Sequence, residues 1–217
     1  GLVVRKNLDR RFSFKAEALA LTVQADDAKN TTDTIALNRD LHFRSAVYEL
    51  SGQIEFNFLP FESGNSLYPW TPFIYTGISI FSFNPKAETT NGEWIDLQPL
   101  GTEGQGTSLY PNREKYSLTQ VSIPIGGGIK IAVNESFNII LEYGARKTFT
   151  DYLDDVSTTY PDQTKLTAEN GNIASQMSDP KGNHIVGQDR GNPDKNDWYS
   201  YAGITLSFKI RQKTSGC

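Results

Sequence analysis

The stretch FNIILEYGARKTFTDYLDDVSTTY, residues 137–160, decides the fold class of this chain. Apolar and polar residues alternate through its first half, and the polar positions include Glu142 and Arg146. An alternation with a period of two is typical of a strand with one apolar face and one polar face. After Thr150 the alternation stops and an acidic, polar segment begins. The stretch therefore predicts a β-strand that leads into a long loop.

The same design recurs along the chain. Together with this stretch, the alternating segments that predict strands are residues 1–6, 11–24, 45–58, 72–84, 116–133 and 198–210. The connections between the seven segments run short, long, medium, long, short and long, and the long loops fall at about 26–44, 85–115 and 151–197. This regular order is typical of an up-and-down membrane barrel, which has short turns on one side and long loops on the other.

These features predict an all-β protein, an eight-stranded antiparallel up-and-down transmembrane β-barrel that forms one domain over residues 1–217. Bacterial single-chain barrels have even strand numbers, so we expect seven visible strands and a first strand and signal peptide that are missing from this sequence. No run approaches the roughly 18 apolar residues of a membrane helix, which excludes a helical membrane protein. A soluble β-sandwich is the alternative, although its connections would be less regular.

Composition narrows the function classes. The net charge of −4 is mild and argues against nucleic acid as a partner, because nucleic-acid binding requires a basic stripe. Aromatic residues are abundant, and Trp70 and Trp198 near strand ends are candidates for an interfacial girdle. The single cysteine, Cys217, allows no intramolecular disulfide.

The cost of charge in lipid predicts which face of each strand points inward. A Lys or Arg that faces lipid at mid-membrane costs roughly 2–4 kcal/mol. We therefore expect a lumen charge network of Lys15, Glu17, Glu49, Glu55, Lys130, Glu142, Arg146 and Lys209. The interior of an eight-stranded barrel is just filled by side chains, so these balanced charges favour a packed, salt-bridged core over a transport path.

The sequence predicts no catalytic, cofactor-binding or metal-binding residues, and no cofactor. His42 and His184 lie in predicted loops, and no G-x-S-x-G nucleophile motif is present. Asp151, Asp154 and Asp155 do not have the spacing of a calcium-binding loop. We expect these carboxylates to form a solvated loop entrance or a turn.

Two backbone signals fall in the segment 116–133. Gly126-Gly127-Gly128 has no following Lys-Ser/Thr and no helix, so it predicts a bend or a tightly packed interior rather than a phosphate loop. Pro124 lacks the N–H that a sheet ladder requires, so it predicts a bulge or a local break in pairing.

Three runs together resemble a known family: IEFNFLPF (54–61), LQPLGTEGQG (97–106) with YSLTQVSIP (116–124), and RKTFTDYLDDVSTTY (146–160). They are similar to the Bacteroidota outer-membrane β-barrel family that includes PorG, a component of the type IX secretion system. The resemblance covers most of the chain from about residue 12 to 208. It implies a non-enzymatic protein of the cell outer membrane in protein secretion and gliding motility.

The resemblance also implies partners. Such a protein would anchor or dock the periplasmic ring of the machinery, formed by a lipoprotein and its partner subunit, and would contact outer-membrane lipid. Candidate partner-binding residues in the connector and tail are Phe61, Glu62, Tyr68, Arg211 and Lys213. The alternatives are a small barrel for transport or binding of a small ligand, binding through the long outer loops, and an enzyme that uses His42 or His184.

Overall fold

A computed structural model describes residues 1–29 and 34–210 of the chain. The strands are β1 Leu2–Asn7, β2 Phe12–Asp26, β3 His42–Asn57, β4 Trp70–Glu88, β5 Trp94–Asp96, β6 Thr119–Ala132, β7 Phe137–Thr148 and β8 Trp198–Phe208. The helices are η1 Asp27–Lys29, α1 Thr34–Arg39, η2 Gln98–Leu100, α2 Gln163–Asn170 and α3 Asn172–Ser178.

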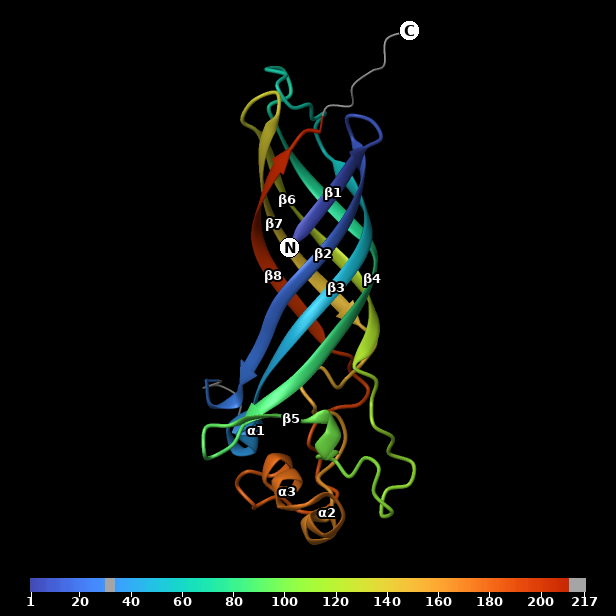
Figure 1. Ribbon diagram of the computed structural model, residues 1–217, viewed down its shortest axis with the longest axis vertical. Helices are drawn as coiled ribbons and strands as arrows, with labels where there is room; N and C mark the ends of the chain where they lie inside the picture. Colours follow the sequence, from blue (N-terminus) through green and yellow to red (C-terminus); the bar gives the residue numbers. More distant parts are fainter. Residues whose placement is uncertain (30–33, 211–217) are drawn as a thin grey trace.

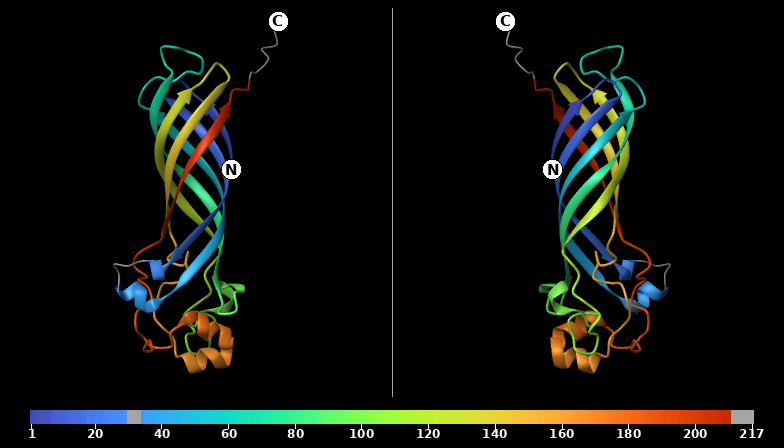
Figure 2. Two further views of the ribbon diagram at one scale, coloured as in Figure 1. Left: turned by 90° about the vertical axis from the view of Figure 1, so that its left-hand side faces the viewer. Right: turned by 90° about the vertical axis from the view of Figure 1, so that its right-hand side faces the viewer.

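The strands form one antiparallel sheet in the order β1-β2-β3-β4-β6-β7-β8, and β5 pairs with β4 outside this path. Figure 1 shows that the sheet curls into a barrel-like wall of tilted strands, and Figure 2 shows the same wall from two sides. The all-β up-and-down fold is therefore confirmed. β1 and β8 are the two edges, and they run in the same direction because six antiparallel steps separate them. The expected eighth strand between them stays a prediction.

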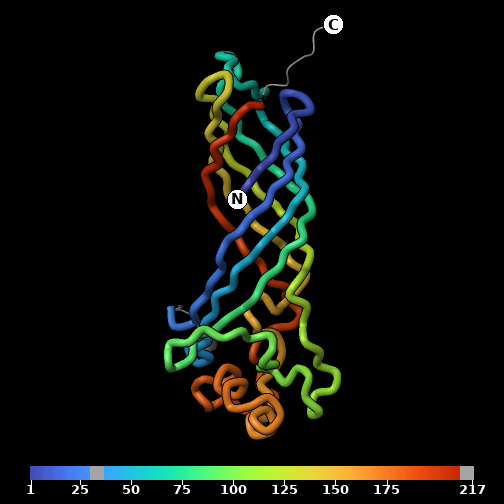
Figure 3. Tube along the Cα trace, in the orientation of Figure 1, coloured from blue at the N-terminus to red at the C-terminus, as the bar shows by residue number. Residues whose placement is uncertain are grey.

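The two ends of the wall differ. The tube in Figure 3 shows the β1–β2 turn, the β6–β7 turn and the connector between β3 and β4 at one end, which we call the turn end. The described parts of the three long loops lie together at the opposite end, the loop end, where residues 27–29, 34–41, 89–118 and 149–197 form a folded cap. The cap contains β5 and all the helices, which the sequence analysis did not predict. One of these helices, α2, begins at Asp162, whose side chain accepts a hydrogen bond from the backbone N–H of Lys165 and so caps the helix.

The wall is apolar outside and charged inside. Outward positions carry exposed hydrophobic side chains, including Ile78 at 73 %, Ile204 at 70 % and Tyr48 at 64 % exposure. Inward positions carry charges, and Lys15 and Arg146 are both 0 % exposed. This arrangement is the reverse of that expected for a soluble barrel. Within residues 1–29 and 34–210, no helix is both long enough and apolar enough to span a membrane.

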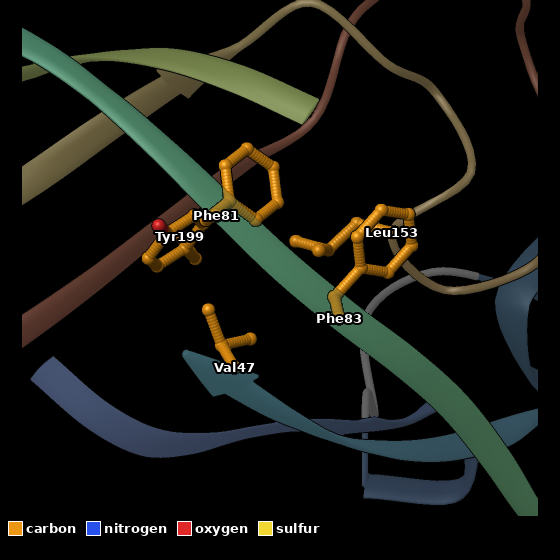
Figure 4. Packing of buried hydrophobic residues seen from close by; sticks show 5 residues of the cluster. All are labelled: Val47, Phe81, Phe83, Leu153 and Tyr199. Atoms are coloured by element: carbon orange, nitrogen blue, oxygen red, sulfur yellow. The ribbon is translucent and has the colours of Figure 1, made fainter. Parts of the chain in front are cut away.

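An apolar layer closes the barrel below the cap. Val47, Phe81, Phe83, Leu153 and Tyr199 form one buried cluster, which Figure 4 shows between the strands and the loop that follows β7. Phe81 packs edge-on against Tyr199, with ring centroids 5.6 Å apart. Because Leu153 belongs to the cap, this layer joins the cap to the sheet.

Inward glycines make room for one large ring. A Cβ atom at Gly126 or Gly144 would overlap the Tyr75 side chain, so both glycines allow that ring to cross the lumen. The expected tight interior at Gly126–Gly128 is therefore confirmed. The break expected at Pro124 is also present, since the β4–β6 register passes from Thr76↔Ile125 to Ser79↔Ser122.

The space around Tyr75 gives a direct test of this packing. We expect Gly144→Ala to destabilise the protein by about 1–3 kcal/mol, because the added methyl group overpacks the Tyr75 hydroxyl and the Arg146 guanidinium. The measurement is urea unfolding in detergent micelles, followed by tryptophan fluorescence. Gly203→Ala is the matched control, since its Cβ would meet the Tyr201 ring at an ordinary 3.7 Å. Equal stability of the two variants would contradict the packing described here.

Candidate functional site

A cluster of buried ions fills the middle of the lumen. Arg146 on β7 donates from Nε to Glu49 on β3, at 3.0 and 2.9 Å, and its Nη2 lies 3.4 Å from Glu17 on β2. Lys15 Nζ lies 3.4 Å from Glu17 and 3.3 Å from Glu142. The alternation of each strand places these side chains inward, and only a curled sheet brings β2, β3 and β7 within ion-pair distance.

Tyrosine hydroxyls complete the hydrogen bonding of this cluster. Tyr199 donates to Glu49 at 2.6 Å, and Tyr201 donates to Glu142 at 2.6 Å. The Lys15 ammonium also lies 4.2 Å from the centroid of the Tyr75 ring, within cation–π range. The central charges are therefore paired and largely hydrogen-bonded, which offsets their loss of hydration. Within the described residues, Arg146 Nη1 has no hydrogen-bond partner.

A second ion cluster lies nearer the turn end. Arg5 on β1 binds both oxygens of Glu55, at 2.6 and 2.8 Å, and Lys130 donates to the same carboxylate at 2.7 Å. The sequence analysis did not include Arg5 in the lumen network. Arg5 and Val3 occupy alternate positions of β1, and both point to the inner face. The prediction for Lys209 was wrong, because β8 ends at Phe208 and Lys209 is exposed beyond it. The other seven predicted charges line the interior.

The lumen is filled rather than open. The exposures of the charged side chains are 0 % for Glu55, 1 % for Lys130, 4 % for Glu17 and 6 % for Glu142. A water-filled channel would leave such groups accessible. The balanced charges therefore form a structural core, as the sequence predicts.

The connector of residues 58–69 folds across the turn end. Its Phe61 N–H donates to the Arg10 carbonyl in the β1–β2 turn, at 3.0 Å. Its Ser63 hydroxyl donates to the Asn138 side chain at the start of β7, at 2.8 Å. Because it reaches both neighbouring turns, the connector closes this end and joins three segments into one surface.

The predicted partner-binding residues have different environments. Phe61 is 9 % exposed and packs inward, so it supports the connector rather than presenting itself to a partner. Glu62 pairs with Arg10 at 3.2 Å, with both side chains substantially exposed, and the Arg10 guanidinium lies 5.1 Å from the Tyr68 ring centroid. The remaining two predicted residues, Arg211 and Lys213, lie outside the described residues.

A buried carboxylate organises the cap at the loop end. Glu103 is 0 % exposed and accepts hydrogen bonds from the backbone N–H groups of Ser157 and Thr158, at 2.8 and 2.9 Å. Arg190 lies 3.1 Å from Glu103 and 3.9 Å from Asp155. Burial by itself raises the pKa of Glu103, but Arg190 and these N–H groups outweigh it and hold the pKa below its ordinary value. The sequence analysis did not identify this hub.

The acidic residues after Thr150 lie in a turn, as one of the two expectations had it, and the Asp155 N–H donates to the Tyr152 carbonyl at 3.2 Å. The other expectation, a solvated loop entrance, was wrong. Asp155 is 0 % exposed and accepts hydrogen bonds from Thr102 Oγ1 at 2.5 Å and Tyr116 Oη at 2.8 Å. Asp151 has a buried Oδ2 with no hydrogen-bond partner within the described residues. These carboxylates belong to the interior of the cap, because three loops fold over them.

The histidines have structural contacts. His184 Nδ1 lies 2.7 Å from Asp179 Oδ1, and its ring stacks on Tyr160 with centroids 4.1 Å apart. His42 Nε2 accepts the backbone N–H of Glu88 at 3.0 Å. Across the described parts of the chain, no three His, Cys, Asp or Glu side chains are grouped so that they could hold a metal ion.

Comparison with known proteins gives one match. A family model described as a domain of unknown function, DUF6089, matches residues 1–96, which cover β1 to β5. No curated protein and no solved structure matches the chain. The match covers the half of the wall that contains Arg5, Lys15, Glu17, Glu49 and Glu55.

The central ion pair can be tested by a double-mutant cycle. We expect Arg146→Gln to destabilise the protein by about 3–5 kcal/mol, because Glu49 is left as an uncompensated buried charge. Adding Glu49→Gln should recover part of this loss, since it removes that charge. The measurement is urea unfolding in micelles for the two single variants and the double variant.

The exposed Lys209→Gln variant is the control for removal of a cation, and it should change stability by less than about 0.5 kcal/mol. Strictly additive effects of Arg146→Gln and Glu49→Gln would contradict the pairing.

Proposed function

We propose that this protein is a non-enzymatic outer-membrane barrel that docks a periplasmic protein assembly at its turn end. The observation that carries the proposal is the closed, ion-filled lumen inside an apolar wall. A barrel that conducts nothing through its interior acts through its two ends and its outer surface. The function is therefore anchoring rather than transport.

The dimensions of the wall support a membrane location. β8 carries Trp198 at one end and Phe208 at the other, both exposed, at 55 % and 69 %. Ten residue steps of a strand tilted by about 40° span about 25 Å, the height of the apolar band of outer-membrane barrels. Trp70 on β4, 47 % exposed, extends the aromatic positions around the turn end. Aromatic rings at both borders are typical of an interfacial girdle.

The resemblance to the PorG-containing family supports the choice of partner. In this proposal the periplasmic partner is the ring of the type IX secretion machinery, formed by a lipoprotein and its partner subunit. The docking surface is the joined surface of the β1–β2 turn, the connector and the β6–β7 turn. Exposed apolar side chains on it include Leu8 at 63 %, Leu67 at 78 % and Val133 at 53 %. Solvated apolar groups of this kind are available for burial against a protein partner.

Affinity purification tests the proposal. We expect the tagged full-length protein, extracted from outer membranes in mild detergent, to recover the ring lipoprotein and its partner subunit in stoichiometric amounts. Leu67→Asp should reduce that recovery at least tenfold, because it places a charge in the proposed contact. Mass spectrometry of the eluate, with equal amounts of barrel loaded, is the measurement.

Ile185→Asp is the matched control at the loop end, since Ile185 is 75 % exposed, close to the value for Leu67. It should leave recovery unchanged. Loss of the partner in Ile185→Asp alone would assign docking to the outer loops instead. Recovery of the wild-type barrel alone, in a detergent that keeps the ring intact, would overturn the proposal and favour a barrel that binds a small ligand.

A further inference from the structure

The base of the cap contains more carboxylates than cations. The carboxylate cluster consists of Glu103, Asp151, Asp154, Asp155 and Asp197. Among the described residues, Arg190 alone forms ion pairs with members of this group. The cluster therefore holds several negative charges that the cap does not neutralise. Glu103 and Asp155 are buried, and Asp151, Asp154 and Asp197 are half-buried. Charges that are partly removed from water without a compensating cation are expensive, so protons are the obvious source of compensation.

The cluster lies where the cap joins the sheet. Asp151 follows β7 closely, and Asp197 directly precedes β8. Asp197 Oδ2 accepts the backbone N–H of Leu153 at 2.8 Å, and Leu153 belongs to the apolar layer that attaches the cap. A change in the charge of Asp197 therefore alters a hydrogen bond to the residue that attaches the cap to the sheet.

Asp154 faces a cavity of about 60 Å³ at the junction of the three outer loops. Its Oδ1 accepts the backbone N–H of Val156 at 3.0 Å. The other charged or titratable groups that line this cavity are Asp27, Arg39, His42 and Arg190. Arg39 is held by Asp27 at 2.7 and 2.9 Å, so it is already committed to another carboxylate.

We propose that the cap is a pH-sensitive closure, in which protonation of the carboxylate cluster in a mildly acidic medium tightens the cap over the loop end and ionisation in an alkaline medium loosens it. This pH response is separate from the proposed docking at the turn end, because the cap lies at the loop end and is exposed to the medium there. It requires no ligand other than the proton.

The proton affinities of the aspartates in the folded cap determine how the stability of the cap changes with pH. Burial, together with the charge of Asp197, raises the pKa of Asp154 to about 7. Burial also raises the pKa of Asp151 and of Asp155 to about 6. The folded cap therefore binds more protons than the unfolded chain between the ordinary value of 3.8 and about 7. Stability falls as the pH rises through this window and is lowest above it.

The contribution of Glu103 to the stability of the cap has the opposite pH dependence, because the pKa of Glu103 is held below its ordinary value of 4.5. Its contribution is present above that value and is lost only in more acidic media. The two effects occupy different pH ranges, so a comparison of pH 5.5 with pH 8 excludes the contribution of Glu103. In that comparison we expect looser packing of the cap at pH 8, and the aspartate variants below assign the change to the cluster.

Amide hydrogen exchange in detergent micelles tests the proposal. The reporting amides are those of Asp155, Tyr160, Arg190 and Gly191, which donate to carbonyl groups within the cap. After correction for intrinsic exchange, we expect protection of these amides to be at least tenfold greater at pH 5.5 than at pH 8. The amides of β3 and β4, which lie in the wall, should show no such change.

Asp154→Asn keeps the acceptor for Val156 and removes the titration, so it should reduce the pH dependence at least threefold. Asp151→Asn is a second variant, in case the first alters the fold of the cap. Asp194→Asn is the matched control, since Asp194 is an exposed aspartate in the same loop. Equal protection of the wild-type cap at both pH values, or an unchanged pH dependence in both cluster variants, would overturn the proposal.

Discussion

The burial of the Arg146 guanidinium is the constraint on which the rest of the wall depends. Its carboxylate partners, Glu49 and Glu17, lie 97 and 129 residues away in the chain. A buried cation left without them would cost several kcal/mol, so the sheet must curl until β2, β3 and β7 face one another. Because successive side chains of a strand point to opposite faces, the apolar residues between the inward charges then lie on the outer face.

A filled interior limits what the protein can do. The two ion clusters, the Tyr75 ring and the apolar layer around Phe81 occupy the lumen from the turn end to the loop end. Each end is then closed by its own segment, the connector on one side and the cap on the other. The proposed docking uses the surface at the turn end, and the surfaces at the two ends differ. The turn end is compact and partly apolar, whereas the cap is built on buried acidic groups.

The sequence was sufficient for the wall but not for the cap, and the reason is physical. A strand's alternation is local, so the inward positions of seven predicted charges could be read from parity and the cost of charge in lipid. The exceptions are informative: Arg5 lies in a six-residue strand, and Lys209 falls one residue beyond β8. The Glu103 hub joins residues 54 and 87 positions apart, with no periodicity to reveal it. Only Gly101, Gly104 and Gly106, all with positive φ, hint at a tightly folded loop.

The most direct test of the account is nitroxide scanning of β4 from Thr76 to Ile80 in lipid vesicles, with Cys217 replaced by serine. In this stretch β4 is paired with β3 at every position and with β6 at all but Gly77 and Ile78, and its outward and inward positions alternate. Gly77 is left unlabelled, because a side chain there would overlap the backbone of Gly52. The account predicts that labels at Thr76, Ile78 and Ile80 collide with lipid-soluble oxygen, while the label at Ser79 collides with neither oxygen nor a water-soluble nickel reagent. High nickel accessibility at the three outward positions would contradict a membrane-embedded wall. High nickel accessibility at Ser79 would contradict a closed lumen.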